Sequence, residues 1–430
     1  MEVTALYEKK KVETAFKLIN QIKPETDIVV PIAVGEPRTL VETLPEHQGL
    51  KGNRLFQMLS LGPVLDIEKE RLQIVSMFLT GHERVAFQAG KIDLLPNHFS
   101  DVPHILEEIL REPTIMIQTS KMNEEGYFSL GTNADYTMTV IENGAKIIAE
   151  VNEQMPFTDG ENLIHLKDVE GFIETNRPLP TTPDIPLRPA DKKIGRLCAD
   201  LIEDGSTIQI GFGSIPNAIM DDLHEHKELT VHTEMIPDKI VDLMESGAVT
   251  NQNNVFAPGC LTATFAYGSN RLYSFMNENP LIKMMPVKDT NDSRKLAAIP
   301  KLVTINAAIE VDLYGQCNAE TVSGSYYSST GGQADFGIGA RMNKEAKGII
   351  CLHASAKGGA ISKIVPKLSA GAVVTTSKND VDYVVTEFGV AKLRGKTVHE
   401  RAKALIAIAH PDFREQLEED ARSAALLPPK

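Results

Sequence analysis

Short apolar segments alternate with helical patterns along most of this chain. Upstream of residue 176, apolar runs such as DIVVPIAVG (27–35) and TIMIQTS (114–120) are separated by patterns such as ILEEILREP (105–113). Apolar runs of this length, bounded by turn residues, are typical of buried strands, and their alternation with helices predicts parallel sheets covered by helices. The sequence therefore predicts the α/β class.

The same alternation continues downstream of residue 190. The helices expected there span 191–205, 215–226 and 239–247, and the expected strands span 206–210, 228–233, 347–353 and 371–376. Near the C-terminus, Thr397 and Glu400 form a capping box ahead of the run AKALIAIA, and Pro411 can begin a further helix. Both halves of the chain are therefore expected to share one architecture.

A proline-rich segment separates the two halves. Residues 176–189 (NRPLPTTPDIPLRP) contain five prolines, which disfavour both helix and central strand. A chain of 430 residues is also too long for a single ordinary core. We predict two open α/β domains with mainly parallel sheets, one at 1–180 and one at 190–430, with the active site in the cleft between them.

Charge and hydropathy exclude several partners. The formal net charge of -14 repels nucleic acid and anionic lipid, and no block of lysine or arginine offsets it. The longest apolar run, Ile28–Val34, contains a proline and falls far short of the roughly 20 residues that a membrane-spanning helix needs. The N-terminus, MEVTALYEKKK, lacks the apolar core of a secretory signal. We expect a cytoplasmic protein with neither a nucleic-acid nor a membrane partner.

Metal-binding patterns and several familiar catalytic motifs are missing from the sequence. The four cysteines, Cys198, Cys260, Cys317 and Cys351, are widely separated and form no CxxC pair. The sequence contains no HExxH zinc motif, no GxSxG elbow and no GxxxxGK[ST] phosphate loop, and its histidines are scattered. No metal site is expected.

Glu234 is the first candidate for a chemical role. The strand-like run that leads into VHTEMIPD (231–238) ends on this single carboxylate. Some 20 residues upstream, the apolar run STIQI leads into the glycine-rich turn GFGSIPNA (211–218). A strand followed by glycines and then a helix directs free backbone amides at a ligand, which favours a phosphate, a carboxylate or an oxyanion.

The glycine-rich turn also has two other interpretations. Gly211 and Gly213 match the GxG of a dinucleotide fingerprint, but Pro216 occupies the position of its third glycine. Glu234 lies about where a ribose-binding acid would lie, so a nicotinamide-dependent oxidoreductase is one alternative. A tight turn that binds no ligand is the other.

A second glycine-rich turn, STGGQADFG (329–337), offers further donors. Gly331 and Gly332 allow the backbone to approach a ligand closely, and Gln333 adds a side-chain amide. Donors of this kind stabilise a developing oxyanion, each typically contributing about 10²- to 10³-fold in rate. A glycine-rich connector without a chemical role is the alternative.

Two charged residues follow later strands. Lys357 precedes two glycines in CLHASAKGG (351–359) and is either solvated or a counter-charge for a phosphate or thiolate. Glu387 directly follows the apolar run DYVVT, and it forms an ion pair with Lys392 or Arg394 or acts as a second active-site carboxylate. A like charge near Glu234 would raise its pKa.

Segments in both halves of the chain resemble the acetyl-CoA hydrolase/transferase family, most closely its 4-hydroxybutyrate and butyryl CoA-transferase branch. In the C-terminal half these are GFGSIPNAI, VHTEMIPDKIVDLMESG, STGGQADF, ASAKGGAISKIVP and VTEFGVAKLRGKTVHERAKALIAIAHPDFREQL. In the N-terminal half they are NHFSDVPHIL, EEGYFSLGTNADYT and IIAEVNEQMP. The resemblance covers essentially the whole chain.

The resemblance implies a role for each candidate residue. Glu234 would be the nucleophile, forming first a mixed acyl anhydride and then a glutamyl-CoA thioester. Gly332 would donate its amide to the oxyanion, Glu387 would be a second active-site glutamate, and Asn279 would be an active-site asparagine. The residues implied to contact coenzyme A (CoA) are Gly211, Phe212, Gly213, Ser214, Ile215, Ser328, Gly331 and Lys357.

The resemblance also implies the reaction. We expect ping-pong transfer of CoA between a short-chain acyl-CoA and a free carboxylate such as 4-hydroxybutyrate or butyrate, with CoA as substrate and no metal or redox cofactor. Pro237 and Lys239 stand where relatives commonly have a small residue and glycine. A dicarboxylate such as succinate or itaconate would need a cation, for which the candidates are Arg271, Arg294 and Arg341. An acyl-CoA hydrolase is an alternative, and a homo-oligomer is expected.

Overall fold

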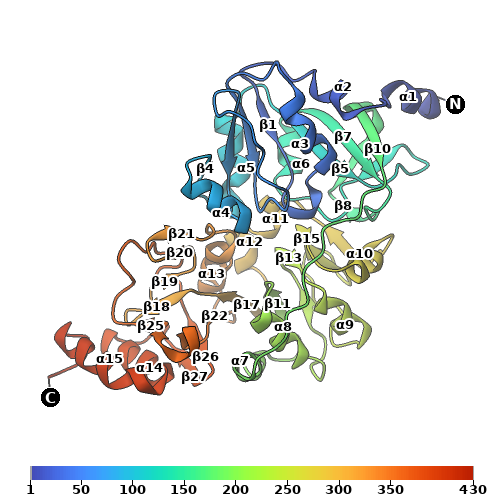
Figure 1. Ribbon diagram of the computed structural model, residues 1–430. Helices are drawn as coiled ribbons and strands as arrows, with labels where there is room; N and C mark the ends of the chain where they lie inside the picture. The colour runs from blue at the N-terminus through green and yellow to red at the C-terminus, as the bar shows by residue number, and fades with distance from the viewer. Residues whose placement is uncertain (1, 430) are drawn as a thin grey trace. The chain divides into compact units, whose positions relative to one another are not determined.

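The computed structural model describes residues 2–429, and the chain divides into two compact units (Figure 1). The first unit contains Met1–Thr182, Met235–Asp238 and Thr262–Thr290, and the second contains Pro183–Glu234, Lys239–Leu261 and Asn291–Lys430. The first boundary falls inside the proline-rich segment that was predicted to link the domains. Because two later segments return to the first unit, one division between residues 180 and 190 describes the chain incompletely.

The first unit is built on a seven-stranded sheet in which all neighbouring strands are parallel. In spatial order the strands are β10 (Val169–Thr175), β7 (Lys146–Asn152), β5 (Thr114–Thr119), β1 (Asp27–Val29), β2 (Asn53–Gln57), β3 (Leu72–Ser76) and β4 (Ile92–Leu94). The α-helices among these strands and at the N-terminus are α1 (Glu2–Lys10), α2 (Ala15–Ile19), α3 (Arg38–Thr43), α4 (Gly81–Gln88), α5 (Val102–Ile109) and α6 (Thr137–Glu142). All six residues of β5 are buried, as expected for a parallel strand covered on both faces.

The two return segments complete the first unit with short elements. The strand β13 (Met235–Ile236) pairs in parallel with β15 (Phe265–Ala266), and Met235 and Phe265 belong to the same buried cluster as Tyr136. The remaining short elements are β6 (Tyr127–Ser129), β8 (Asp159–Gly160), β9 (Leu163–His165), β14 (Leu261–Ala263), β16 (Ile282–Met284), α10 (Asn270–Met276) and α11 (Val287–Thr290). Met235 and Phe265 pack into the core of the first unit, which explains why their segments belong to that unit although they follow residue 190 in the sequence.

The second unit contains a six-stranded sheet that is parallel except at one edge. In spatial order its strands are β12 (Thr230–Val231), β11 (Thr207–Ile210), β17 (Leu302–Ala307), β22 (Lys347–Cys351), β26 (Tyr383–Thr386) and the antiparallel β27 (Gly389–Lys392). Its α-helices are α7 (Pro189–Ala199), α8 (Ser214–Asp221), α9 (Lys239–Glu245), α12 (Ser293–Ala297), α13 (Gln333–Met342), α14 (Val398–Ile408) and α15 (Pro411–Ser423). The α/β prediction with mainly parallel sheets is confirmed.

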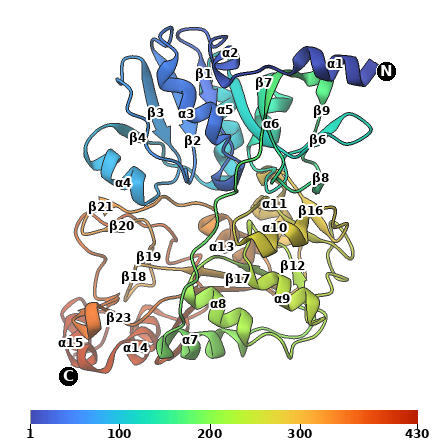
Figure 2. The ribbon, with the colours of Figure 1, turned by 45° about the vertical axis from the view of Figure 1, so that its right-hand side comes forward.

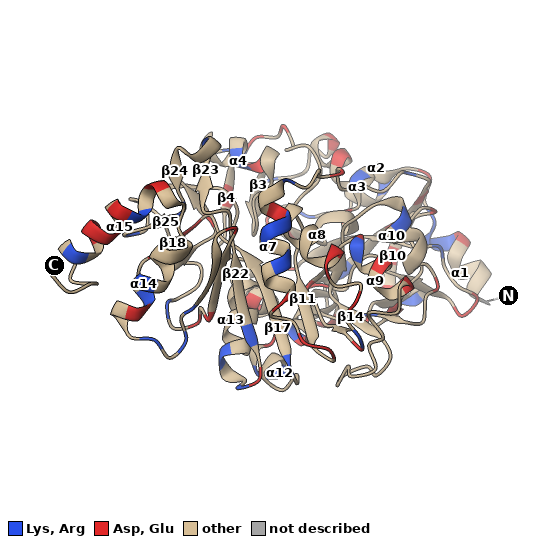
Figure 3. Ribbon diagram, turned by 90° about the horizontal axis from the view of Figure 1, so that it is seen from below, with Lys and Arg blue, Asp and Glu red and all other residues tan. Residues whose placement is uncertain are grey.

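The helices α7 and α8 pack closely against each other, side by side in Figure 2. A Cβ atom at Gly195 of α7 would lie 2.7 Å from the backbone carbon of Ala218 in α8, so only glycine permits this approach. Figure 3 shows basic and acidic residues along α7, whereas β11 and β17 carry none. The contact between Gly195 and Ala218 therefore fixes α7 against α8, the helix that follows the first glycine-rich turn.

Strand order in the second unit determines where its loops meet. The chain passes from β11 to β12 on one side and later returns to β17 on the other side of β11, so the order reverses at β11. Ligands of open α/β sheets bind at the carboxyl ends of the strands, at such a reversal. The loops at this edge follow β11, β12, β22 and β26, and they carry Gly211, Glu234, Lys357 and Glu387.

The C-terminal helices follow the sequence prediction closely. Thr397 caps α14, and its hydroxyl accepts from the backbone of Glu400 while the Glu400 side chain accepts from the backbone of Thr397. The helix α15 begins at Pro411. Among residues 2–429, no helix has both the length and the apolar character needed to cross a membrane.

Candidate active site

Glu234 lies directly beyond the carboxyl end of the second unit's parallel sheet. Its side chain is partly buried, and its Oε2 atom accepts a hydrogen bond from the Nδ2 atom of Asn291 at 2.7 Å. Asn291 is fully buried and immediately precedes Asp292, which caps α12. A carboxylate and an amide that are 57 positions apart in the sequence therefore meet at the edge of the sheet.

Gly332 provides the space that the Glu234 carboxylate occupies. A Cβ atom at position 332 would lie 1.8 Å from Oε2 of Glu234 and 2.4 Å from Nδ2 of Asn291, which no side chain tolerates. Gly332 is also the N-cap of α13, so the carboxylate lies at the start of this helix. Partial positive charge at a helix N-terminus favours an anion at this position.

The surroundings of Glu234 raise its pKa. The pKa of the Glu234 carboxyl is raised to about 7; burial is the largest cause, the hydrogen bond from Asn291 lowers the pKa, and the negative charge of Asp335 raises it. Asp335 lies in the first turn of α13, and its Oδ2 atom is 3.4 Å from Nδ2 of Asn291. A carboxylate with weakened solvation is a better nucleophile than one in water.

The turn after β11 leaves its backbone accessible. Gly213 has φ 135°, a conformation that side chains disfavour, and a Cβ atom at Gly211 would meet nothing within 4 Å. Ser214 begins α8 directly after these glycines, while Phe212 between them is an exposed apolar side chain. Open space thus surrounds Gly211 just ahead of the N-terminus of α8, and binding of a ligand there stays a prediction.

Side-chain donors at the second glycine-rich turn bind neighbouring segments of the protein. Gln333 donates its amide to Sγ of Cys317 at 3.4 Å and to Oγ1 of Thr376 at 3.1 Å, so this amide anchors the turn to those two segments. The Ser328 hydroxyl donates to the carbonyl of Ala319 at 3.2 Å. Gly331 has φ 59° and forms the bend that precedes Gly332. Gln333 was predicted to donate to a ligand, whereas its amide binds Cys317 and Thr376.

Lys357 and Glu387 belong to neighbouring loops. Lys357 is exposed and begins a turn in which three consecutive residues, 357–359, have φ values of 50°, 66° and 96°. Glu387 is partly buried and accepts the backbone N–H of Ala354 at 2.8 Å, so it anchors the loop that carries Lys357.

The ion pair that offered an alternative role for Glu387 is not formed. Lys392 lies over the ring of Tyr383, with its Nζ 5.3 Å from the ring centroid. Arg394 donates to the backbone carbonyl of Arg341 at 2.8 Å. The carboxylate of Glu387 instead binds the loop described above.

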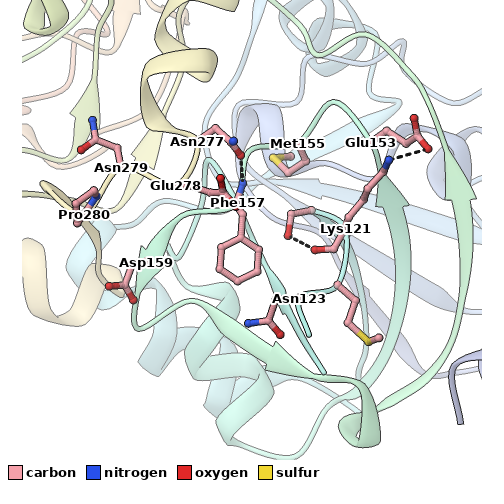
Figure 4. A pocket seen from close by; sticks show the side chains of 12 residues that line it. Lys121, Asn123, Glu153, Met155, Phe157, Asp159, Asn277, Glu278, Asn279 and Pro280 are labelled. Atoms are coloured by element: carbon pink, nitrogen blue, oxygen red, sulfur yellow. Dashed lines mark hydrogen bonds and ion pairs between the residues drawn. The ribbon is translucent and has the colours of Figure 1, made fainter. Parts of the chain in front are cut away.

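Asn279 lies in the first unit, where it lines a pocket of about 560 Å³ (Figure 4). Its Nδ2 atom donates to the carbonyl of Phe275 at 2.9 Å, and its Oδ1 atom accepts the N–H of Leu281 at 3.0 Å. Both groups of this amide therefore stabilise a local turn. The other residues that line the pocket are Ser120, Lys121, Met122, Asn123, Glu153, Met155, Phe157, Asp159, Asn277, Glu278 and Pro280.

Sequence reasoning missed Asn291, the asparagine that contacts Glu234. The segment TNDSRK shows no strand pattern, and only the Asp292 cap marks the start of a short helix there. That cap was a signal that places Asn291 at a helix N-terminus, but the contact with Glu234 depends on tertiary folding. A catalytic role for Asn279 stays a prediction.

The candidate cations for a dicarboxylate have other partners. Arg294 is highly exposed and binds Asp292 at 3.0 Å, and Arg341 pairs with Asp380 at 2.5 Å. Arg271 belongs to the first unit. Pro237 and Lys239 were the two departures from the family pattern. Lys239 is the first residue of α9 and forms an ion pair with Asp221 of α8.

Among the described residues, no group of three or more histidine, cysteine, aspartate or glutamate side chains is arranged to hold a metal ion. The groups that the second unit brings together at the sheet edge are instead a carboxylate of raised pKa, a buried amide, and glycines at the starts of two helices. Such a set suits attack on a carbonyl and stabilisation of the resulting oxyanion.

Family models match both halves of the chain. The acetyl-CoA hydrolase/transferase N-terminal domain matches residues 1–183, and the corresponding C-terminal domain matches residues 268–421. The fold and the relatives of the chain define a member of the CoA-transferase class of enzymes. The chain belongs to the acetyl-CoA hydrolase/transferase family.

Several characterised relatives cover nearly the full chain. The chain is 44% identical over 404 residues to a succinyl-CoA:cyclohexane-1-carboxylate CoA transferase of Geobacter metallireducens, which covers 93% of this chain and 92% of the relative. It is 39% identical over 423 residues to a 4-hydroxybutyrate coenzyme A transferase of Clostridium kluyveri, covering 97% of this chain and 98% of the relative. A crystal structure of 4-hydroxybutyrate CoA-transferase from Porphyromonas gingivalis matches with a TM-score of 0.80 and 33% identity, covering 98% of this chain and 99% of that one.

Proposed function

We propose that the protein transfers CoA reversibly between a short-chain acyl-CoA and a free carboxylate, with Glu234 as the covalent nucleophile. The observation that carries this proposal is the placement of Glu234 against Gly332, in a site that raises the carboxyl pKa to about 7. A carboxylate of this kind attacks an activated thioester readily because a thiolate is a good leaving group.

The reaction begins with an oxygen of Glu234 attacking the thioester carbonyl carbon. The carbon–sulfur bond breaks, CoA leaves as the thiolate, and an anhydride between the acyl group and Glu234 remains. The thiolate then attacks the side-chain carbonyl carbon of Glu234 and displaces the acyl group as its free carboxylate. The resulting glutamyl-CoA thioester reacts with the incoming acid by the reverse steps, so no proton or water is consumed.

The neighbouring groups have distinct roles in this scheme. The amide of Asn291 binds the Glu234 carboxylate and holds it in place, and the backbone N–H of Gly332 is proposed as the oxyanion donor. The turn Gly211–Ile215 is proposed to contact CoA, and Lys357 supplies positive charge near the thiolate or a phosphate. Charge complementarity matters here because the chain as a whole is acidic.

The relatives support a broad class of acids. Their names specify cyclohexane-1-carboxylate, succinyl-CoA and 4-hydroxybutyrate, which share only a carboxylate or its thioester. We propose a small monocarboxylate such as 4-hydroxybutyrate or butyrate as acceptor. A dicarboxylate would need a cation freed from its present partner, such as Arg341 from Asp380. A homo-oligomeric state and a cytoplasmic location stay predictions.

Covalent trapping tests the nucleophile. The protein is incubated with acetyl-CoA and treated with borohydride, which reduces a glutamyl thioester, and the modified residue is located by mass spectrometry. We expect modification at Glu234 that disappears in Glu234→Ala and persists in Glu225→Gln, a control at an exposed carboxylate nine positions earlier in the sequence. Full transferase activity in Glu234→Ala would contradict the proposal.

The same preparation separates transfer from hydrolysis. We expect acetyl-CoA to lose its acyl group beyond one equivalent per active site only when a carboxylate acceptor is present. Equal release of CoA without any acceptor would identify an acyl-CoA hydrolase, because water would then resolve the covalent intermediate.

A further inference from the structure

Asp191 is a fully buried carboxylate in the first turn of α7. Its Oδ1 atom accepts hydrogen bonds from the Ser214 hydroxyl at 3.0 Å and from Nε2 of His353 at 2.7 Å. Its Oδ2 atom accepts the backbone N–H of Arg188 at 2.8 Å and the Nε–H of the same residue at 3.3 Å. Four donors from three separate segments therefore converge on one buried side chain.

These bonds keep Asp191 ionised at neutral pH. Burial opposes ionisation, but the bonds from Arg188, His353 and Ser214 outweigh it, so the pKa of Asp191 is lowered. Removal of one partner of a buried charge costs more than the bond itself, because the remaining group stays desolvated. A shift of Arg188, Ser214 or His353 would therefore leave the buried charge of Asp191 without one of its hydrogen bonds.

Two of the three segments carry residues assigned above to CoA. Ser214 is the first residue of α8 and directly follows the glycines of the turn Gly211–Ile215. His353 lies four residues before Lys357, and Glu387 fixes the same loop through the N–H of Ala354. Asp191 itself is fully buried, so its influence on a ligand passes through its hydrogen-bonding partners.

The close packing of α7 on α8 makes Asp191 a rigid support. Gly195 allows α7, which carries Asp191, to contact Ala218 of α8. The position of Asp191 is therefore fixed relative to Ser214, the first residue of α8. A carboxylate on a rigid helix can hold two loops in a defined relation, whereas a solvated side chain cannot.

We propose that Asp191 is a positioning residue that aligns the turn Gly211–Ile215 with the loop His353–Lys357 for CoA binding. This inference rests on the proposed function, since it assigns both segments to CoA. Asp191 takes no part in bond formation, and its effect is confined to the half-reaction in which CoA is captured.

The kinetics of the two half-reactions test this role. For Asp191→Asn we expect kcat/KM for the acyl-CoA to fall about tenfold or more, equivalent to the loss of one or two charge-assisted hydrogen bonds. We expect kcat/KM for the carboxylate to change less than about threefold. In that half-reaction CoA is already bound covalently to Glu234, so weaker contacts to CoA destabilise the glutamyl-CoA intermediate and the transition state of its reaction with the acid equally. A fall of equal size in both parameters, or in neither, would overturn the inference.

A double-mutant cycle separates positioning from general loss of structure. If Asp191 acts through the turn, Asp191→Asn should have a smaller effect in a Ser214→Ala background than in the original protein. Strictly additive effects would contradict action through Ser214. The matched control is Asp200→Asn on the exposed end of the same helix, which should leave both parameters unchanged.

Two further measurements cover the remaining outcomes. If Asp191→Asn does not fold, His353→Ala removes one donor and leaves the carboxylate in place, and it should show the same selective fall at a smaller size. Borohydride labelling at Glu234 under saturating acetyl-CoA should remain complete in these variants. Absence of labelling in the original protein would instead refute the proposed function, so the two failures are distinguishable.

Discussion

The carboxylate of Glu234 occupies the space that any side chain at Gly332 would fill, since a Cβ atom there would lie 1.8 Å from Oε2. We therefore expect Gly332→Ala to displace the nucleophile and lower kcat/KM at least ~100-fold, as small misplacements of reacting groups do. The measurement is steady-state transfer from acetyl-CoA, with folding checked by thermal unfolding.

Gly337→Ala is the matched control for this prediction, because it places the same substitution on the same helix, α13. A Cβ atom at position 337 would have its nearest neighbour at 3.7 Å, an ordinary contact. Alanine within a helix is favoured over glycine by roughly 0.5–1 kcal/mol, so activity should be retained and stability should not fall. Comparable loss of activity in both variants would show that the space at Gly332 is not the cause.

The ionisation of Glu234 predicts the pH dependence of acylation. Its pKa is raised to about 7, so the reactive carboxylate is lost as the pH falls through this value and is fully present above it. We expect kcat/KM for the acyl-CoA to rise with pH and level off above about 7. A profile that is flat from pH 5 to pH 8 would contradict a raised pKa in the free enzyme.

Substitution of Asp335 should move this profile. The negative charge of Asp335 raises the pKa of Glu234, so Asp335→Asn should shift the midpoint to lower pH. Asp412→Asn, at an exposed position on α15, should leave the midpoint unchanged. A midpoint that stays in place in Asp335→Asn would show that the charge of Asp335 does not raise the pKa of Glu234.

Two asparagines can be compared directly for a role beside the nucleophile. Asn291→Ala removes the hydrogen bond that lowers the pKa of Glu234, so the midpoint should rise and kcat/KM at pH 7 should fall about 10²-fold. The resemblance implied an active-site role for Asn279, whose amide bonds within a local turn of the first unit. A larger loss in Asn279→Ala than in Asn291→Ala would favour Asn279 as the active-site asparagine.

The comparison of the two asparagines shows what sequence patterns can supply. The strands before Glu234 and Glu387 were predictable because local apolar runs mark strands, and the ends of parallel strands share one edge. The contact between Glu234 and Asn291 was not predictable, because it joins residues 57 positions apart through tertiary packing. Family motifs predicted Glu234 as the nucleophile and Asn279 as an active-site asparagine, and both roles stay predictions.

One predicted strand is wrong for a local reason. Residues 371–376 (GAVVTT) contain two valines and two threonines, yet they form no strand, and only Thr376 makes an isolated bridge, to Cys317. Gly371 has φ 79°, which begins a bend, and Val374 is 48% exposed. Strand propensity depends on a buried, pleated environment, and this segment lacks that environment.

A second buried carboxylate, in the first unit, predicts a pH dependence of stability. Glu36 is 2% exposed, its Oε2 accepts the Ser60 hydroxyl at 2.7 Å, and its Oε1 has no hydrogen-bond partner, with Nε of Arg38 at 4.0 Å. Burial raises the pKa of Glu36 from 4.5 to about 7. The folded protein therefore holds this proton more tightly than the unfolded chain, so its contribution to stability is present below pH 4.5 and is lost as the pH rises to about 7.

Glu36→Gln removes this titration while keeping the shape of the side chain. A pKa difference of about 2.5 corresponds to at most about 3 kcal/mol, so the stability of the variant relative to the original protein should increase by up to that amount between pH 5 and pH 8. Urea unfolding at the two pH values measures the difference, and Glu70→Gln at an exposed position serves as control. Because the shape change acts equally at both pH values, a difference that does not vary with pH would show that Glu36 ionises in the folded protein as it does in water.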